Sequence, residues 1–135
     1  MVGWWRKPLS AAHLRAGASA ERAAERYLRR QGLRLRHRNY RCRGGELDLV
    51  MADSDSLIFV EVRHRRGSQF GGALASVTAA KQQRLLRAAH EYLLREKIPG
   101  QQPCRCDVVT VEGDLGNPRI EWIRHAFDLD STGAF

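Results

Sequence analysis

Two segments of the chain repeat apolar residues every three or four positions, which is the spacing of an amphipathic helix. The first covers residues 10–31 and the second residues 77–97. A glycine follows the first segment at Gly32, and Pro99 and Gly100 follow the second, as is typical where helices end. The apolar faces consist of Ala16, Ala20, Ala23, Ala24, Tyr27 and Leu28 in the first helix, and of Leu85, Leu86, Ala89, Tyr92 and Leu93 in the second.

The remaining periodic segments have the composition of strands. Residues 33–40 alternate apolar with basic side chains and predict a first, partly exposed strand. Residues 44–50 and 57–63 are rich in branched apolar residues, and the polar turn 53–56 between them predicts a hairpin. Both faces of this hairpin are apolar near the turn, which indicates a central position with cover on both sides. Further strands are predicted at residues 106–111 and 119–123.

Acidic residues interrupt both arms of the predicted hairpin. Side chains alternate along a strand, so Leu47 should share a face with Leu49, while Asp48 should point to the other side. A symmetric turn makes the numbers of paired residues sum to a constant. The predicted pairs are Met51 with Ile58, Val50 with Phe59, Asp48 with Glu61, and Glu46 with Arg63.

The facing pair Asp48 and Glu61 needs an explanation, because like charges directly opposed destabilise a sheet. One explanation is a cation between the two carboxylates, or a carboxyl group whose pKa is raised. The alternative is a local salt-bridge cluster, in which Arg63 and Arg65 neutralise the acids. A third acid, Glu21, lies at the rim of the apolar face of the first helix and is expected to look toward the sheet. Its alternative role is that of a boundary residue paired with an arginine.

The positive charge of the chain is concentrated near its start. The 135 residues carry a net charge of +8, yet residues 1–45 alone carry +10 and residues 46–135 carry −2. Such polarity is typical of a protein that binds a polyanion such as nucleic acid, although solubility alone is the alternative. The side chains that could meet phosphates are Arg41 and Arg43 before the hairpin, Arg65 and Arg66 after it, and Lys81 and Arg84 on the second helix.

Length and composition predict one soluble domain in the cytoplasm. No apolar run approaches the roughly 20 residues that span a bilayer, and the first residues lack the apolar core of a signal peptide. The three cysteines, Cys42, Cys104 and Cys106, match neither a disulfide framework nor a zinc motif. The five histidines show no spacing typical of metal ligands.

Several motifs resemble those of the YraN-like family of small bacterial proteins, over roughly residues 12–127. The segment 45–50 resembles that family's Gly-Glu-Ile-Asp-Leu-Ile, and the segment 59–65 resembles its Phe-Val-Glu-Val-Lys-x-Arg. Gly17 and Glu21 resemble its Gly-x-x-x-Glu, and the segment 105–107 resembles its Arg-Phe-Asp. The order of elements also resembles the PD-(D/E)xK nuclease core of archaeal Holliday-junction resolvases and tRNA-splicing-endonuclease-like domains.

The resemblance implies an α/β fold with a restriction-endonuclease-like core. In this core a central mixed sheet contains the hairpin, and helices flank both of its faces. It implies one domain at residues 10–127, with a flexible segment 1–9 before it and a tail 128–135 after it. It also implies a metal-dependent nuclease that hydrolyses phosphodiester bonds in DNA or structured RNA, with DNA preferred, and that could form a homodimer. Asp48 and Glu61 would then be ligands of Mg²⁺ or Mn²⁺, and Glu21 would be a third acid near the metal.

One position departs from the nuclease pattern, because Arg63 stands where the motif has lysine. Arginine stays protonated and cannot act as a general base, but it can bind a phosphate through two hydrogen bonds. Catalysis involving Arg63 is therefore one possibility. A nucleic-acid-binding module with impaired catalysis is the second, and a protein-interaction domain is the third.

Overall fold

The computed structural model describes residues 11–65 and 77–129, which form two helices and five strands. Both predicted helices are confirmed to within two residues at each end. The elements in chain order are α1 (Ala11–Arg30), β1 (Arg34–Cys42), β2 (Gly45–Ala52), β3 (Leu57–Arg65), α3 (Ala79–Arg95), β4 (Cys104–Glu112) and β5 (Arg119–Phe127). The predicted segment 1–9 and most of the predicted tail lie outside the described residues.

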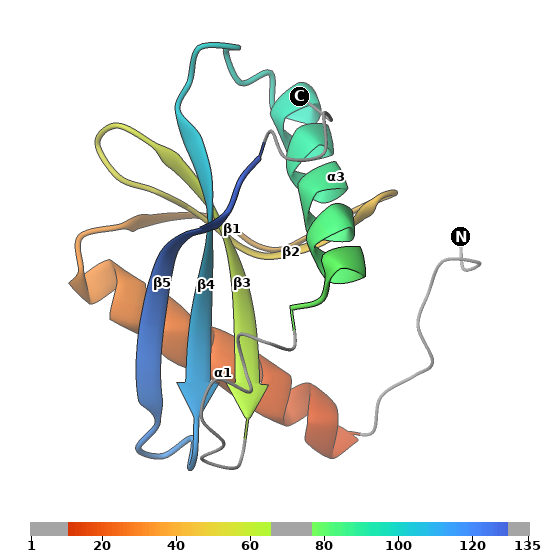
Figure 1. Cartoon of the computed structure of the whole chain (residues 1–135). Coiled ribbons are helices and arrows are strands. Elements are labelled where there is room, and N and C mark those ends of the chain that lie inside the picture. Colours follow the sequence, from red (N-terminus) through yellow and green to blue (C-terminus); the bar gives the residue numbers. More distant parts are fainter. Residues whose placement is uncertain (1–10, 66–76, 130–135) are drawn as a thin grey trace.

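The five strands form a single mixed sheet in the order β1-β2-β3-β4-β5. β3 and β4 run parallel, with α3 between them in the chain, and all other neighbours are antiparallel. Helix α1 covers one face of the sheet and α3 packs against the other (Figure 1). The predicted α/β architecture, with a mixed sheet flanked by helices on both faces, is confirmed. In the described part of the chain, no helix is long and apolar enough to cross a membrane.

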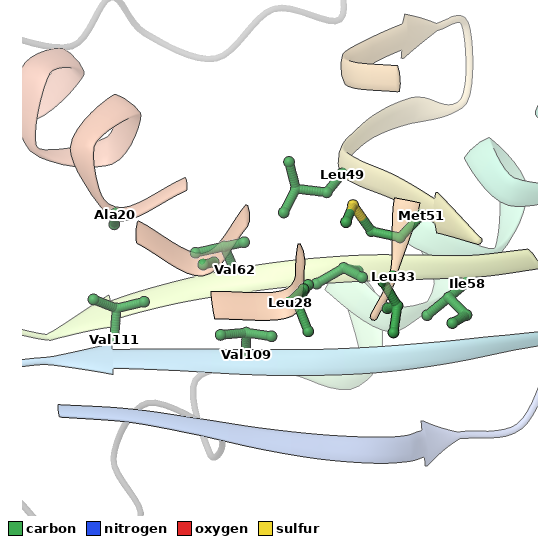
Figure 2. Close-up of a cluster of buried hydrophobic side chains, with 11 residues drawn as sticks. Ala20, Leu28, Leu33, Leu49, Met51, Ile58, Val62, Val109 and Val111 are labelled. Carbon is green, nitrogen blue, oxygen red and sulfur yellow. The ribbon is translucent and has the colours of Figure 1, made fainter. Parts of the chain in front are cut away.

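Two separate apolar cores hold the helices on the sheet. On the α1 side, Ala20 and Leu28 pack against Val62 of β3 and Val109 of β4, as Figure 2 shows. On the α3 side, Tyr92 is fully buried beside Phe59 of β3, and their rings meet edge to face at 5.7 Å. Strands β2, β3 and β4 contribute to both cores, which explains their nearly continuous apolar sequences.

The hairpin has the predicted register near its turn. Its recorded pairs include Met51 with Ile58 and Val50 with Phe59, both as predicted. This pairing ends at Leu49–Val60, and beyond it the side chain of Asp48 accepts a hydrogen bond of 2.9 Å from the Val62 amide. A carboxylate oxygen thus takes the place of a strand carbonyl where β2 leaves β3. Figure 1 shows the two strands separating there, β2 running beneath α3 and β3 continuing along α1.

The predicted alternation fails where the strands separate. Leu47 packs in the core under α3 together with Val50, whereas Leu49 packs in the core under α1. The prediction that Leu47 and Leu49 share a face was therefore wrong, because it assumed that β2 stays paired with β3 beyond Leu49.

Two strands extend further than predicted. Arg41 and Cys42 belong to β1, because they pair with Glu46 and Gly45 of β2. β5 continues to Phe127, across a register shift opposite Cys106 and Val108. His125 has a positive φ of 52° at this irregularity, and its amide is held by the buried Asp107 carboxylate at 2.9 Å.

Candidate active site

A cavity of about 440 Å³ lies where β2 and β3 separate. Its lining joins both sides of the sheet, since α1 contributes Glu21 and α3 contributes Lys81, Arg84 and Leu85. The acidic residues at the cavity are Glu21, Glu46, Asp48 and Glu61, and the basic residues are Arg41, Arg43, Arg63, Lys81 and Arg84. The cavity therefore combines an acidic interior set with a basic set of similar size.

Asp48 is at the centre of the acidic group. Desolvation by burial raises its pKa well above the usual range, and repulsion by Glu61 and Glu21 raises it further. The Val62 amide, which donates to the carboxylate at 2.9 Å, acts in the opposite direction. Together these effects leave the pKa of Asp48 raised, so the fold brings these carboxylates close together without fully neutralising them.

Glu21 faces the same group from helix α1. Burial raises the pKa of its carboxyl to about 7, with further contributions from the charges of Glu46 and Glu61. Hydrogen bonds from Asn39 and Asp48 lower the pKa and so favour the ionised form. The prediction that Glu21 looks toward the sheet is confirmed, whereas Glu25, one turn later, is buried in ion pairs with Arg29 and Arg38 at 3.1 and 2.7 Å.

Arginines are paired with two of the cavity's acids. Arg63 contacts Glu61 at 3.2 Å on the same strand, and both side chains are largely buried, at 23% and 15% exposed. Arg41 contacts Glu46 across the β1–β2 pair at 3.6 Å. The salt-bridge interpretation of the acidic hairpin is therefore correct in part, and it coexists with the raised pKa values of Asp48 and Glu21.

Two adjacent glycines allow α3 to approach the cavity. A Cβ atom at Gly45 would lie 3.0 Å from the carbonyl oxygen of Arg84, and one at Gly44 would lie 3.0 Å from Cβ of Arg87. Gly45 also has a φ of +155°, which L side chains rarely adopt. The Glu91 side chain of α3 accepts hydrogen bonds of 3.3 Å from the amides of Arg43 and Gly44. These contacts place Lys81 and Arg84 beside the acids.

The structure brings most of the predicted site residues together. Eight of them line the cavity: Glu21, Asp48, Glu61, Arg63, Arg41, Arg43, Lys81 and Arg84. Arg65 is exposed at the end of β3 and is not among the lining residues, while Arg66 lies outside the described residues.

Sequence reasoning left Glu46 and Asn39 out of the site. Glu46 lies two residues before Asp48 and lines the cavity with it, so strand alternation was a usable signal. Asn39 hydrogen-bonds Glu21 from a left-handed conformation with a φ of 47°. Its contribution depends on the irregular path of β1, which no periodic pattern indicates.

The donor set has the chemistry that a hard divalent cation requires. Carboxylate oxygens suit Mg²⁺ and Mn²⁺, and burial together with the charges of neighbouring carboxylates raises the pKa values of Asp48 and Glu21. Among residues 11–65 and 77–129, however, no three histidine, cysteine or acidic side chains form a ready-made metal cage. Mg²⁺ characteristically keeps several water ligands and uses only one or two carboxylates plus substrate phosphates, so a complete protein cage is not required.

Fold and cavity together define a class of α/β protein in which a mixed sheet opens between two strands to expose a cluster of acids. This chain belongs to the family described as uncharacterised protein family UPF0102, whose sequence profile matches residues 20–111. The resemblance to the YraN-like family is thereby confirmed.

Relatives from several bacteria share about half of their residues with this chain. A UPF0102 protein of Cupriavidus taiwanensis is 55% identical over 120 residues, covering 87% of this chain and 86% of the relative. A UPF0102 protein of Nitrosococcus oceani is 49% identical over 121 residues, covering 90% and 98% respectively. A third, from Nitrosomonas europaea, is 52% identical over 112 residues, covering 83% and 92%. These relatives match nearly the whole chain.

Proposed function

We propose that this chain is a metal-dependent nuclease that hydrolyses phosphodiester bonds, with DNA as the preferred substrate. The observation that carries the proposal is the meeting of Asp48, Glu61 and Glu21 at one cavity whose rim is basic. Acids that stay close together at a free-energy cost are typical of functional sites. The basic rim supplies the complementary half of a phosphodiester site, because phosphate oxygens carry the negative charge.

Asp48 and Glu61 would hold a Mg²⁺ or Mn²⁺ ion, with Glu21 as the third acid near it. When bound, such an ion lowers the pKa of a coordinated water and stabilises negative charge on phosphoryl oxygens. The Val62 amide fixes one oxygen of Asp48. Asn39 orients Glu21, so that the chain preorganises both carboxylates before a substrate arrives.

Arg63 would bind a substrate phosphate rather than remove a proton. Its guanidinium contacts Glu61 at 3.2 Å, and this contact directs it toward the cavity that both residues line. Because arginine does not deprotonate, the attacking water must lose its proton to a carboxylate or to solvent. Glu21, the third acid at the cavity, is the carboxylate that we assign to accept it.

A second candidate function is nucleic-acid binding without cleavage. The observation that favours it is the ion pair of Arg63 with Glu61. Arg63 stands in place of the motif lysine, and this ion pair makes its guanidinium less available to a substrate. The basic side of the cavity would still bind phosphates in that case. A protein-interaction role, a cytoplasmic location and a homodimer stay predictions.

Cleavage assays on linear and branched DNA and on RNA, with Mg²⁺ or Mn²⁺, test the proposal. We expect Asp48→Asn and Glu61→Gln to lower the cleavage rate by at least 100-fold, roughly the loss typical for one essential charged group. Asp55→Asn is the matched control, because Asp55 is exposed in the hairpin turn at the other end of β2 and β3. Cleavage that survives both cavity substitutions would overturn the assigned site.

Substitution of Arg63, which stands in place of the motif lysine, distinguishes the two candidate functions. If the chain binds DNA without cutting it, Arg63→Lys tests whether the arginine is the cause. Cleavage gained by Arg63→Lys and lost again with Asp48→Asn would assign the nuclease chemistry to this cavity. Binding that falls steeply with salt, with no cleavage by either protein, would favour the second candidate.

A further inference from the structure

The stretch from Arg26 to Arg43 contains eight arginines and no acidic residue or lysine. It covers the last part of α1, the connection and all of β1. All eight side chains are exposed: Arg26, Arg29, Arg30, Arg34, Arg36, Arg38, Arg41 and Arg43. The exclusive use of arginine is informative, because its planar guanidinium binds phosphate through two hydrogen bonds, whereas lysine acts as a point charge.

The register of β1 shows that this stretch leads to the cavity. The first residue of β1, Arg34, pairs with Ala52 near the hairpin turn. The last residues of β1 pair with Glu46 and Gly45 at the cavity. β1 is an edge strand, so one side of it is not covered by the sheet. Nine strand residues span about 30 Å at roughly 3.3 Å each.

Two arginines of β1 offer positive charge to a nucleic-acid backbone. Arg34 and Arg36 are both exposed, and Arg36 lies at the register shift between Leu35 and His37. Arg38 is held in place by hydrogen bonds of 2.7 and 3.0 Å to Glu25, and the structure records no carboxylate partner for Arg34 or Arg36 within its described residues.

We propose that Arg30, Arg34, Arg36 and Arg38 form an arginine track that binds the backbone of a nucleic-acid duplex extending away from the cavity. This inference rests on the proposed function only in the role that it gives to the cavity, which lies at one end of the track. Solubility alone does not explain the track, because the opposite edge strand, β5, is also exposed yet mixes Arg119 and Arg124 with Glu121. The track spreads its positive charge over several residues, which favours a long polyanion over a single phosphate group.

Binding of a 30-base-pair DNA duplex by the full chain, measured by fluorescence anisotropy in EDTA between 50 and 200 mM KCl, tests the track. The test variant is Arg34→Ala/Arg36→Ala, and the matched control is Arg119→Ala/Arg124→Ala on the other edge of the sheet. Each lost phosphate contact lowers the slope of log K against log salt by about 0.9. We expect the test variant to lose about 1.8 in slope and about 60-fold in affinity at 0.1 M salt. The control should keep the wild-type slope.

Arg34→Lys/Arg36→Lys guards against a folding artefact, since it keeps both charges and should restore most of the slope. Equal losses in the two alanine pairs, or no loss in either, would overturn the track. The result is independent of cleavage, because EDTA removes the divalent ions. A chain that binds through the track but never cuts DNA would refute only the nuclease proposal. A nuclease whose Arg34→Ala/Arg36→Ala variant keeps the wild-type slope would refute only the track.

Discussion

Replacing Glu21 by glutamine should stabilise the metal-free protein at neutral and alkaline pH. Burial of Glu21, together with the charges of Glu46 and Glu61, raises its pKa from the usual value near 4.5 to about 7. The folded protein therefore keeps a proton that the unfolded chain has already released over this interval. The free energy of unfolding therefore falls as pH rises from about 4.5 to about 7. Above that range Glu21 causes no further loss of stability.

The size of the effect follows from the shifted pKa. A rise from 4.5 to about 7 corresponds to at most about 3.4 kcal/mol, at 1.36 kcal/mol for each pH unit. Glu21 is only partly buried, so solvent screening reduces this figure, and we expect about 1–2 kcal/mol. Glu21→Gln should recover that amount at pH 8 and have little effect at pH 4, where the carboxyl is protonated in both states.

Urea unfolding in EDTA, followed by circular dichroism at pH 4, 6 and 8, measures this difference. Glu25→Gln is the control, since Glu25 lies one turn further along α1, is buried, and accepts hydrogen bonds from Arg29 and Arg38. Loss of its charge should destabilise the protein at pH 8 by about 1–3 kcal/mol. A Glu21→Gln protein that is no more stable than wild type at pH 8, or equally stabilised at pH 4, would refute the argument from carboxylate repulsion.

Two further substitutions probe the surroundings of the site. Gly45→Ala should cost about 1–3 kcal/mol and weaken Mg²⁺ binding measured by calorimetry, because its Cβ would lie 3.0 Å from the Arg84 carbonyl oxygen. Gly100→Ala meets no atom within 4 Å and should leave both quantities unchanged; equal losses in the two variants would contradict the proposed close approach. Asp107→Asn should cost about 2–4 kcal/mol in urea unfolding without changing Mg²⁺ affinity, because its buried carboxylate accepts from Trp122 Nε1 at 2.8 Å. Unchanged stability would contradict that role.

The parts of the fold that depend on periodicity were predictable from the sequence. The apolar spacing of α1 gave its bounds to within one residue, and the alternation of Phe59 and Val60 gave both faces of β3. The hairpin register near the turn followed from keeping the apolar faces together, as the pair Met51–Ile58 shows. These features follow from the local sequence because each helix or strand repeats the same pattern of buried and exposed positions along its length.

Features created by a break in regular structure were not predictable in the same way. The separation of β2 from β3 moves Leu47 to the core under α3, and the kink at Asn39 brings an amide to Glu21. Both depend on tertiary contacts that span the sheet. The acidic members of the site were found because charged residues within apolar strands are conspicuous, and the ion pair of Arg63 with Glu61 agrees with the salt-bridge alternative that the sequence left open.

The separation of β2 from β3 links the stability of the fold to the proposed chemistry. If the ladder continued past Leu49–Val60, a strand carbonyl would accept the Val62 amide and Asp48 would directly oppose Glu61. Instead the Asp48 carboxylate satisfies that amide, and the cavity lies where the strands part. The apolar cores on both sides of the sheet hold this arrangement against the repulsion of its acids. A substitution that relieves the repulsion should therefore raise stability and lower metal binding together, which is the relation expected when a fold maintains a reactive site at its own cost.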